Sequence, residues 1–247
     1  MASERHQFAV YEAGLSDLKV ISQRLKILGF DLIHRITKVL RLEVGEQLVL
    51  FDAQKSMVCQ VLEIGRKEVV LSVQSEKRHA PLQHRVIMAV GVLKKDHFED
   101  ALYSCVELGA TEIWPILFQK SQGWNFNAQR LQQILISAAE QSKNFSIPVC
   151  QAPITGAEFF QKLATDNQST YVACDVAGEP FLDVLQTLQS KHPAQVVLIV
   201  GPEGDLTASE KAALQAAQVR LMRLTPTVLR SIQAVAVGLG AIRSVLK

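Results

Sequence analysis

The residues best suited to hold a ligand lie in one loop near the C-terminus. An apolar run, Val196–Val200, is followed by Gly201-Pro202-Glu203-Gly204, and Thr207 and Glu210 have the spacing of a helix capping box. In open α/β sheets, ligands bind beyond the carboxyl ends of the strands. Glycine has no side chain to obstruct a ligand there. The segment predicts backbone groups close to a ligand, although a tight strand-to-helix turn has the same pattern.

A second segment, residues 223–234, combines a strand end with a loop that contains Pro226 and then Leu229 and Arg230. The helix that follows, at about 232–246, is rich in glycine and alanine. Small residues allow close backbone approach, so we expect this helix to pack against another element or a second subunit. A ligand at its N-terminal end is compatible with that packing.

Several common sites have no support in the sequence. The chain has neither of the glycine-rich motifs GxGxxG and GxxxxGK[ST], no GxSxG, and no metal-ligand spacing among its six histidines. Its four cysteines, which lie far apart, form neither a zinc pattern nor a disulfide framework, and buried thiols in a reducing compartment are expected. We therefore predict no bound metal.

Composition and periodicity predict the elements that position these segments. The 247 residues are 48% hydrophobic and 20% charged with a net charge of +2, which argues against disorder, and no apolar run is long enough to span a membrane. Short apolar runs before residue 76 predict a small β-barrel or sandwich, and residues 77–85 are predicted to form a linker. The remainder predicts an α/β domain with a mostly parallel sheet. Its predicted strands are 86–92, 112–117, 171–174 and 196–200, and its predicted helices are 96–108, 128–143 and about 232–246.

The order of these landmarks resembles the RsmE family of ribosomal RNA methyltransferases in the SPOUT superfamily. The matching segments are His34–Leu48, Glu107-Leu-Gly109, Ala139-Glu-Gln-Ser142, Gly201–Gly204 and Leu229-Arg230. The resemblance implies a PUA-like RNA-binding β-barrel over residues 1–76 and a SPOUT domain over residues 86–247 with a C-terminal trefoil knot.

The resemblance also implies a function. Such a protein is a cytoplasmic homodimer that uses S-adenosylmethionine to methylate N3 of one uridine in 16S ribosomal RNA. The residues expected to hold the cofactor come from three strand ends. They are Val200, Gly201, Pro202, Glu203, Gly204, Leu224, Pro226, Leu229 and Cys174.

Chemistry at N3 of uridine requires loss of its proton or stabilisation of the anion, whose charge spreads onto the flanking carbonyl oxygens. A guanidinium beside those oxygens would stabilise that charge, and we predict Arg230 for this role, with a purely structural arginine as its alternative. The residues expected to contact RNA are Arg35, Lys38 and Arg41, which form a local basic cluster.

The sequence is also compatible with other functions. Asp205 stands where the family has a second glycine, and Ile232 stands where it has a carboxylate. These differences are compatible with a catalytically altered or inactive SPOUT protein that binds RNA during ribosome assembly. A SPOUT enzyme acting on another RNA base and an unrelated metabolic α/β enzyme are further alternatives.

Overall fold

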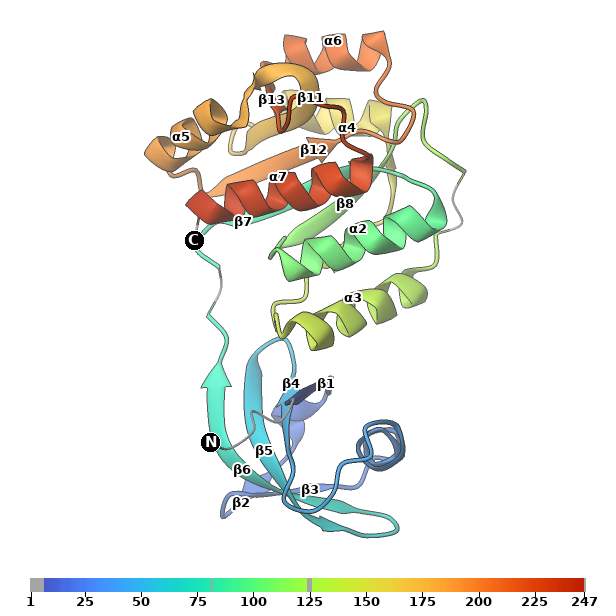
Figure 1. Cartoon of the computed structure of the whole chain (residues 1–247), viewed down its shortest axis with the longest axis vertical. Coiled ribbons are helices and arrows are strands. Elements are labelled where there is room, and N and C mark those ends of the chain that lie inside the picture. The colour runs from blue at the N-terminus through green and yellow to red at the C-terminus, as the bar shows by residue number, and fades with distance from the viewer. Residues whose placement is uncertain (1–6, 81, 124–125, 247) are drawn as a thin grey trace. The chain divides into compact units, whose positions relative to one another are not determined.

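A computed structural model describes residues 7–80, 82–123 and 126–246 (Figure 1). The chain divides into two compact units. Unit 1 runs to Ala80 and includes Ala139–Ser146; unit 2 holds the remaining residues up to Ala138 and those from Ile147 onward. The grouping of residues 139–146 with the N-terminal unit had no signal in the sequence, because it depends on contacts between distant parts of the chain.

Unit 1 is built on a six-stranded sheet in the order β1-β4-β5-β6-β3-β2. Its strands are β1 (Phe8–Tyr11), β2 (Val20–Ile21), β3 (Arg24–Ile27), β4 (Gln47–Phe51), β5 (Lys55–Ile64) and β6 (Val69–Arg78). Alternate residues of β3 and of residues 57–62 in β5 are buried, as expected for a sheet with one face on a core. A short helix α1 (Phe30–His34) continues into a π-helical turn, Arg35–Val39.

Strand β6 extends beyond the apolar run that predicted it. Lys77 and Arg78, which the sequence places at the start of a linker, pair with Ser56 and Lys55 of β5. Backbone pairing needs no apolar side chain, so the hydrophobic pattern ends before the strand does.

Unit 2 is a seven-stranded sheet whose paired strands are all parallel. Six strands follow the order β10-β8-β7-β12-β11-β13, and β9 pairs with β8. The strands are β7 (Arg85–Gly91), β8 (Glu112–Leu117), β9 (Val149–Cys150), β10 (Ile154–Thr155), β11 (Thr170–Pro180), β12 (Gln195–Val200) and β13 (Arg220–Arg223). The predicted fold class, a β-rich N-terminal part followed by an α/β domain, is confirmed; the threading of a trefoil knot stays a prediction.

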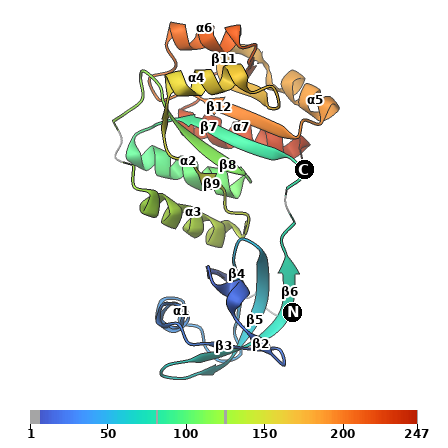
Figure 2. The ribbon, with the colours of Figure 1, turned by 180° about the vertical axis from the view of Figure 1, so that it is seen from behind.

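Helices cover both faces of this sheet (Figures 1 and 2). They are α2 (Lys95–Glu107), α3 (Ala128–Ser142), α4 (Gly156–Thr165), α5 (Phe181–Lys191), α6 (Ala208–Ala216) and α7 (Ser231–Val245). One core joins Ile87, Val197 and Ile199 of the strands to Phe159 of α4 and Leu214 of α6. The opposite face meets α7, where a Cβ at Gly238 would lie 2.9 Å from Leu198. Burial on both faces explains why the central strands are continuously apolar.

The predicted helices 96–108, 128–143 and 232–246 correspond to α2, α3 and α7, with boundaries shifted by about one residue. The capping box of α6 is confirmed, because Thr207 Oγ1 accepts from the Glu210 N–H and the Glu210 carboxylate accepts from the Thr207 N–H. Within the described residues, no helix is both long enough and apolar enough to cross a membrane.

Candidate functional site

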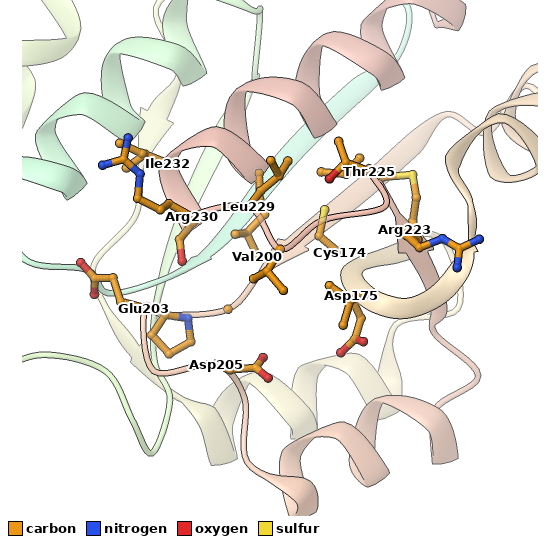
Figure 3. A pocket seen from close by; sticks show the side chains of 18 of the residues that line it. Cys174, Asp175, Val200, Glu203, Asp205, Arg223, Thr225, Leu229, Arg230 and Ile232 are labelled. Carbon is orange, nitrogen blue, oxygen red and sulfur yellow. The ribbon is translucent and has the colours of Figure 1, made fainter.

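A pocket of about 270 Å³ lies at the carboxyl ends of β12 and β13 and beside the middle of β11 (Figure 3). Residues of three segments line it, 174–176, 200–205 and 222–234, together with Leu93, His97 and Lys211. Parallel strands end at one edge of the sheet, which brings together segments that lie far apart along the chain.

The walls of the pocket depend on close backbone contact between loops. A Cβ added at Gly91, the last residue of β7, would lie 2.6 Å from the backbone nitrogen of Pro202. At Gly201 an added Cβ would lie 3.3 Å from Leu206 Cγ. The glycine at the end of β7 therefore allows the loop after β12 to pack directly against it.

One side of the pocket, which we call the Lys211 side, is lined by residues that form ion pairs. Lys211 Nζ on α6 lies 2.8 Å from Asp175 Oδ2 of β11 and 2.8 Å from Asp205 Oδ2 in the loop after β12. Burial raises the pKa of Asp175, but hydrogen bonds from Lys211 and from the Ala177 backbone outweigh it and lower the pKa overall. The same two aspartates raise the pKa of Lys211. The ammonium group of Lys211 thus links β11 to the loop after β12.

The opposite side, which we call the Arg230 side, carries Arg230, Glu203 and His97. Glu203 Oε1 accepts the Lys94 N–H at 3.0 Å and lies 2.9 Å from His97 Nδ1. Burial raises the pKa of Glu203, but hydrogen bonds from His97 and Lys94 lower it overall, so the group is a carboxylate near neutral pH. Arg230, the N-cap residue of α7, is exposed and donates from Nε to Gln233 Oε1 at 3.1 Å.

The remaining lining is mostly apolar. It includes Val200, Met222, Leu224 and Leu229. Cys174 also lines the pocket, and burial raises the pKa of its thiol to about 12, with the negative charge of Asp175 adding to the effect. The cysteine is therefore a neutral, weakly polar group at neutral pH.

The structure brings most of the predicted site residues to this pocket. Arg230 lines it together with Cys174, Val200, Gly201, Pro202, Glu203, Leu224 and Leu229. Gly204 and Pro226 are not among the lining residues. A Cβ at Gly204 would lie 3.0 Å from Lys120 Cβ, so this glycine permits contact with the loop after β8.

Sequence reasoning missed His97 and Lys211 as pocket residues. His97 is separated from Glu203 by 106 positions, and Lys211 is part of an otherwise ordinary amphipathic helix. No local pattern marks either residue, because each is brought to the site by the order of the strands. Among the described residues, no group of three or more His, Cys, Asp or Glu could hold a metal ion.

The basic cluster predicted to contact RNA lies in unit 1, around α1 and the π-helical turn. Arg35 already has a partner within the protein, because its guanidinium pairs with Glu140 Oε2. The other oxygen of that carboxylate, Oε1, accepts the Tyr11 N–H at 2.8 Å. Lys38 and Arg41 are exposed. Phe30 beside them is 78% exposed and stacks on His34 with 6.0 Å between the ring centroids.

Two family models match the chain. Residues 80–243 match an RNA methyltransferase domain, and residues 31–74 match an RNA methyltransferase PUA domain. The first match alone spans more than half of the chain and includes the whole pocket.

Relatives and solved structures agree with these matches. A ribosomal RNA small subunit methyltransferase E from Synechocystis is 30% identical over 219 residues, covering 87% of this chain and 71% of the relative. The enzyme of the same name from Bacillus subtilis is 24% identical, with 85% and 86% covered. Structures of such an enzyme from Neisseria gonorrhoeae, bound to S-adenosylmethionine, and of a Legionella pneumophila methyltransferase in complex with the same cofactor give TM-scores of 0.78 and 0.79. Each is 22% identical and covers 97% of this chain and 98% of its own, which shows a shared fold.

Proposed function

Because the chain belongs to the ribosomal RNA small subunit methyltransferase E family, we propose that it transfers a methyl group from S-adenosylmethionine to N3 of one uridine in 16S ribosomal RNA. The observation that carries the proposal is the pocket formed by the middle of β11 and the carboxyl ends of β12 and β13. It unites Arg230 with loops that the family assigns to the cofactor.

The residues of the pocket fit S-adenosylmethionine. Apolar side chains such as Leu224 and Leu229 suit the adenine ring, and the loop at Gly201 offers backbone groups. Asp175, Asp205 and Glu203 provide negative charge for a ligand that carries a sulfonium and an ammonium group. Bound there, the cofactor supplies an electrophilic methyl group on positively charged sulfur.

The protein's own contribution is to position the uridine and to stabilise its anion. Arg230 lines the pocket at the start of α7, is exposed, and keeps guanidinium donors beyond the one held by Gln233. A guanidinium can hydrogen-bond a uracil carbonyl oxygen on which negative charge develops. Holding both reactants in one pocket makes the transfer effectively unimolecular, and the uridine must leave its stack to enter.

Unit 1 supplies the features expected of an RNA-binding surface. Lys38 and Arg41 are exposed cations suited to phosphate groups, and the nearby Phe30 ring is available for stacking on an unpaired base. We further infer a homodimer, for which the partly exposed Val237 on α7 provides apolar surface. A cytoplasmic location follows from the proposed substrate.

The test is methyl transfer to small ribosomal subunits that lack the modification, followed by mass spectrometry of the nucleosides. Appearance of 3-methyluridine, dependent on both the protein and the cofactor, is the expected result. A different methylated nucleoside would move the target to another base. Absence of both methylation and calorimetric cofactor binding would instead favour an inactive RNA-binding protein, for which Ile232 in the pocket lining is the relevant difference.

A further inference from the structure

His97 lines the pocket and is held there by the loop after β12. It lies in the first turn of α2, and its Nδ1 is 2.9 Å from Glu203 Oε1. The same carboxylate oxygen accepts the Lys94 N–H one turn earlier, so Glu203 fixes both the start of the helix and the imidazole ring. Figure 3 places Glu203 and Arg230 on one side of the pocket, away from Asp175 and Arg223.

The pairing with Glu203 determines which nitrogen of a neutral imidazole is free. An ionised carboxylate only accepts hydrogen bonds, so Nδ1 carries the proton that it donates. Nε2 then carries a lone pair, and among the described residues none forms a hydrogen bond to it. This is the arrangement in which a carboxylate orients a histidine base.

The other titratable groups of the pocket are poor proton acceptors. The Cys174 thiol is protonated because burial raises its pKa to about 12. Lys211 has a raised pKa, so its ammonium has no lone pair, and Asp175 and Asp205 are both paired with it. Glu203 already accepts two hydrogen bonds, and its pKa is lowered. His97 alone among these groups combines a free lone pair with a fixed orientation.

We propose that His97 is the general base that takes the N3 proton of the target uridine, an inference that rests on the function proposed above. The N3–H proton passes to Nε2 as the N3 electron pair forms a bond to the methyl carbon. The bond from that carbon to sulfur breaks, and its electron pair stays on sulfur, giving S-adenosylhomocysteine. The imidazolium then returns its proton to water. Arg230 stabilises the anionic oxygens while His97 removes the proton.

The test compares two histidine-to-asparagine variants. In His97→Asn the amide nitrogen overlays Nδ1 and preserves the donor to Glu203, while Nε2 is lost. His192→Asn is the matched control, because His192 is exposed, does not line the pocket, and has a φ of 44° that asparagine tolerates. The measurements are the single-turnover methylation rate between pH 6 and 9 and the calorimetric dissociation constant of S-adenosylmethionine.

We expect His97→Asn to slow methylation at least about 100-fold. Cofactor affinity should stay within about threefold, and the control should match the wild-type protein. The pH profile of the methylation rate should differ between the wild-type protein and His97→Asn, because the variant lacks Nε2, the proposed proton acceptor. A variant rate within about threefold of wild type, or an unchanged pH profile, would overturn the inference. If the wild-type protein itself fails to methylate, the proposed function falls and this inference falls with it.

Discussion

The two sides of the pocket differ in how fully their charged groups are paired. On the Lys211 side, a single ammonium pairs with two carboxylates, one in β11 and one in the loop after β12. On the Arg230 side, among the residues that the structure describes, the guanidinium of Arg230 has one side-chain partner, Gln233, and one ring nitrogen of His97 has none.

This difference suggests that the residues of the Lys211 side fix the shape of the pocket and that those of the Arg230 side act on the substrate. Fully paired groups gain little from a ligand but hold their loops in one arrangement, and removal of one partner leaves the others uncompensated. Groups with spare donors or acceptors can exchange water for substrate at little cost. Substitutions on the Lys211 side should therefore act on cofactor binding and stability, and those on the Arg230 side should act on the rate of methyl transfer.

The largest effect is expected from Arg230→Ala. Loss of the guanidinium removes the group that stabilises the developing anion, which should lower the single-turnover methylation rate by about 100- to 1,000-fold. The dissociation constant of S-adenosylmethionine should change by no more than a few-fold, because the pocket loops keep their contacts.

Arg223→Ala is the matched control for this prediction. Arg223 is another exposed arginine of the pocket lining and lies on the same side as Asp175 in Figure 3. We expect its loss to change the rate less than about threefold. Equal losses in the two variants would show that general positive charge, rather than the position of Arg230, accounts for the effect.

The two sides of the pocket also differ in how much of them can be predicted from the sequence. The loop after β12 and Arg230 are recognisable because they combine a strand end, glycine and proline, and a helix start within a few positions. The triad of Asp175, Lys211 and Asp205 is not recognisable, because it joins side chains from β11, the loop after β12 and α6 only after the sheet has formed. Glu203 was predicted as a site residue, but its pairing with His97 escapes detection for the same reason.

The secondary-structure elements also differ in how well the sequence predicts them. The central strands β7, β8 and β12 are buried and continuously apolar, so their signal is strong. The short strands β2, β9 and β10, with two residues each, carry no periodicity that could predict them. Helix α4 was not predicted, although Thr155 and Glu158 form the same capping box that marks α6 and give it a recognisable start.

Lys211→Met should have the next largest effect, and it should act on binding. Methionine keeps most of the side-chain volume but removes the charge, which leaves Asp175, whose side chain is 8% exposed, without its cation. We expect the dissociation constant of S-adenosylmethionine to rise about tenfold, consistent with about 1–3 kcal/mol for a buried group that loses its partner. At saturating cofactor the methylation rate should stay within about threefold of wild type. A large fall in that rate with unchanged affinity would assign Lys211 to the chemistry instead.

A smaller effect is expected in the pH dependence of stability. Because the pKa of Asp175 is lowered from its ordinary value of 3.8, its pairing with Lys211 contributes stability that is fully present above that value. The contribution is lost as the pH falls through the lowered pKa. The melting temperature of the wild-type protein should therefore exceed that of Lys211→Met at pH 7, and the gap should narrow below about pH 4. A gap that is constant down to pH 3 would show that the ion pair contributes nothing to folding.

The smallest effect is expected at Asp205, where two contributions oppose each other. Asp205 has a φ of 61°, so glycine would remove a backbone penalty of about 1 kcal/mol. Asp205→Gly would also remove an ion pair with Lys211, and because the Asp205 side chain is 65% exposed, that pair is worth about 0–1 kcal/mol.

These contributions should nearly cancel, so we expect the melting temperature of Asp205→Gly to change by less than about 3 °C and cofactor affinity by less than about threefold. Asp205→Ala is the matched variant, since it loses the ion pair without gaining the freedom of glycine, and it should be the less stable of the two. If Asp205→Gly weakened cofactor binding as much as Lys211→Met, the exposed carboxylate would itself hold the ligand. The Lys211 side would then no longer be the side that only positions the loops.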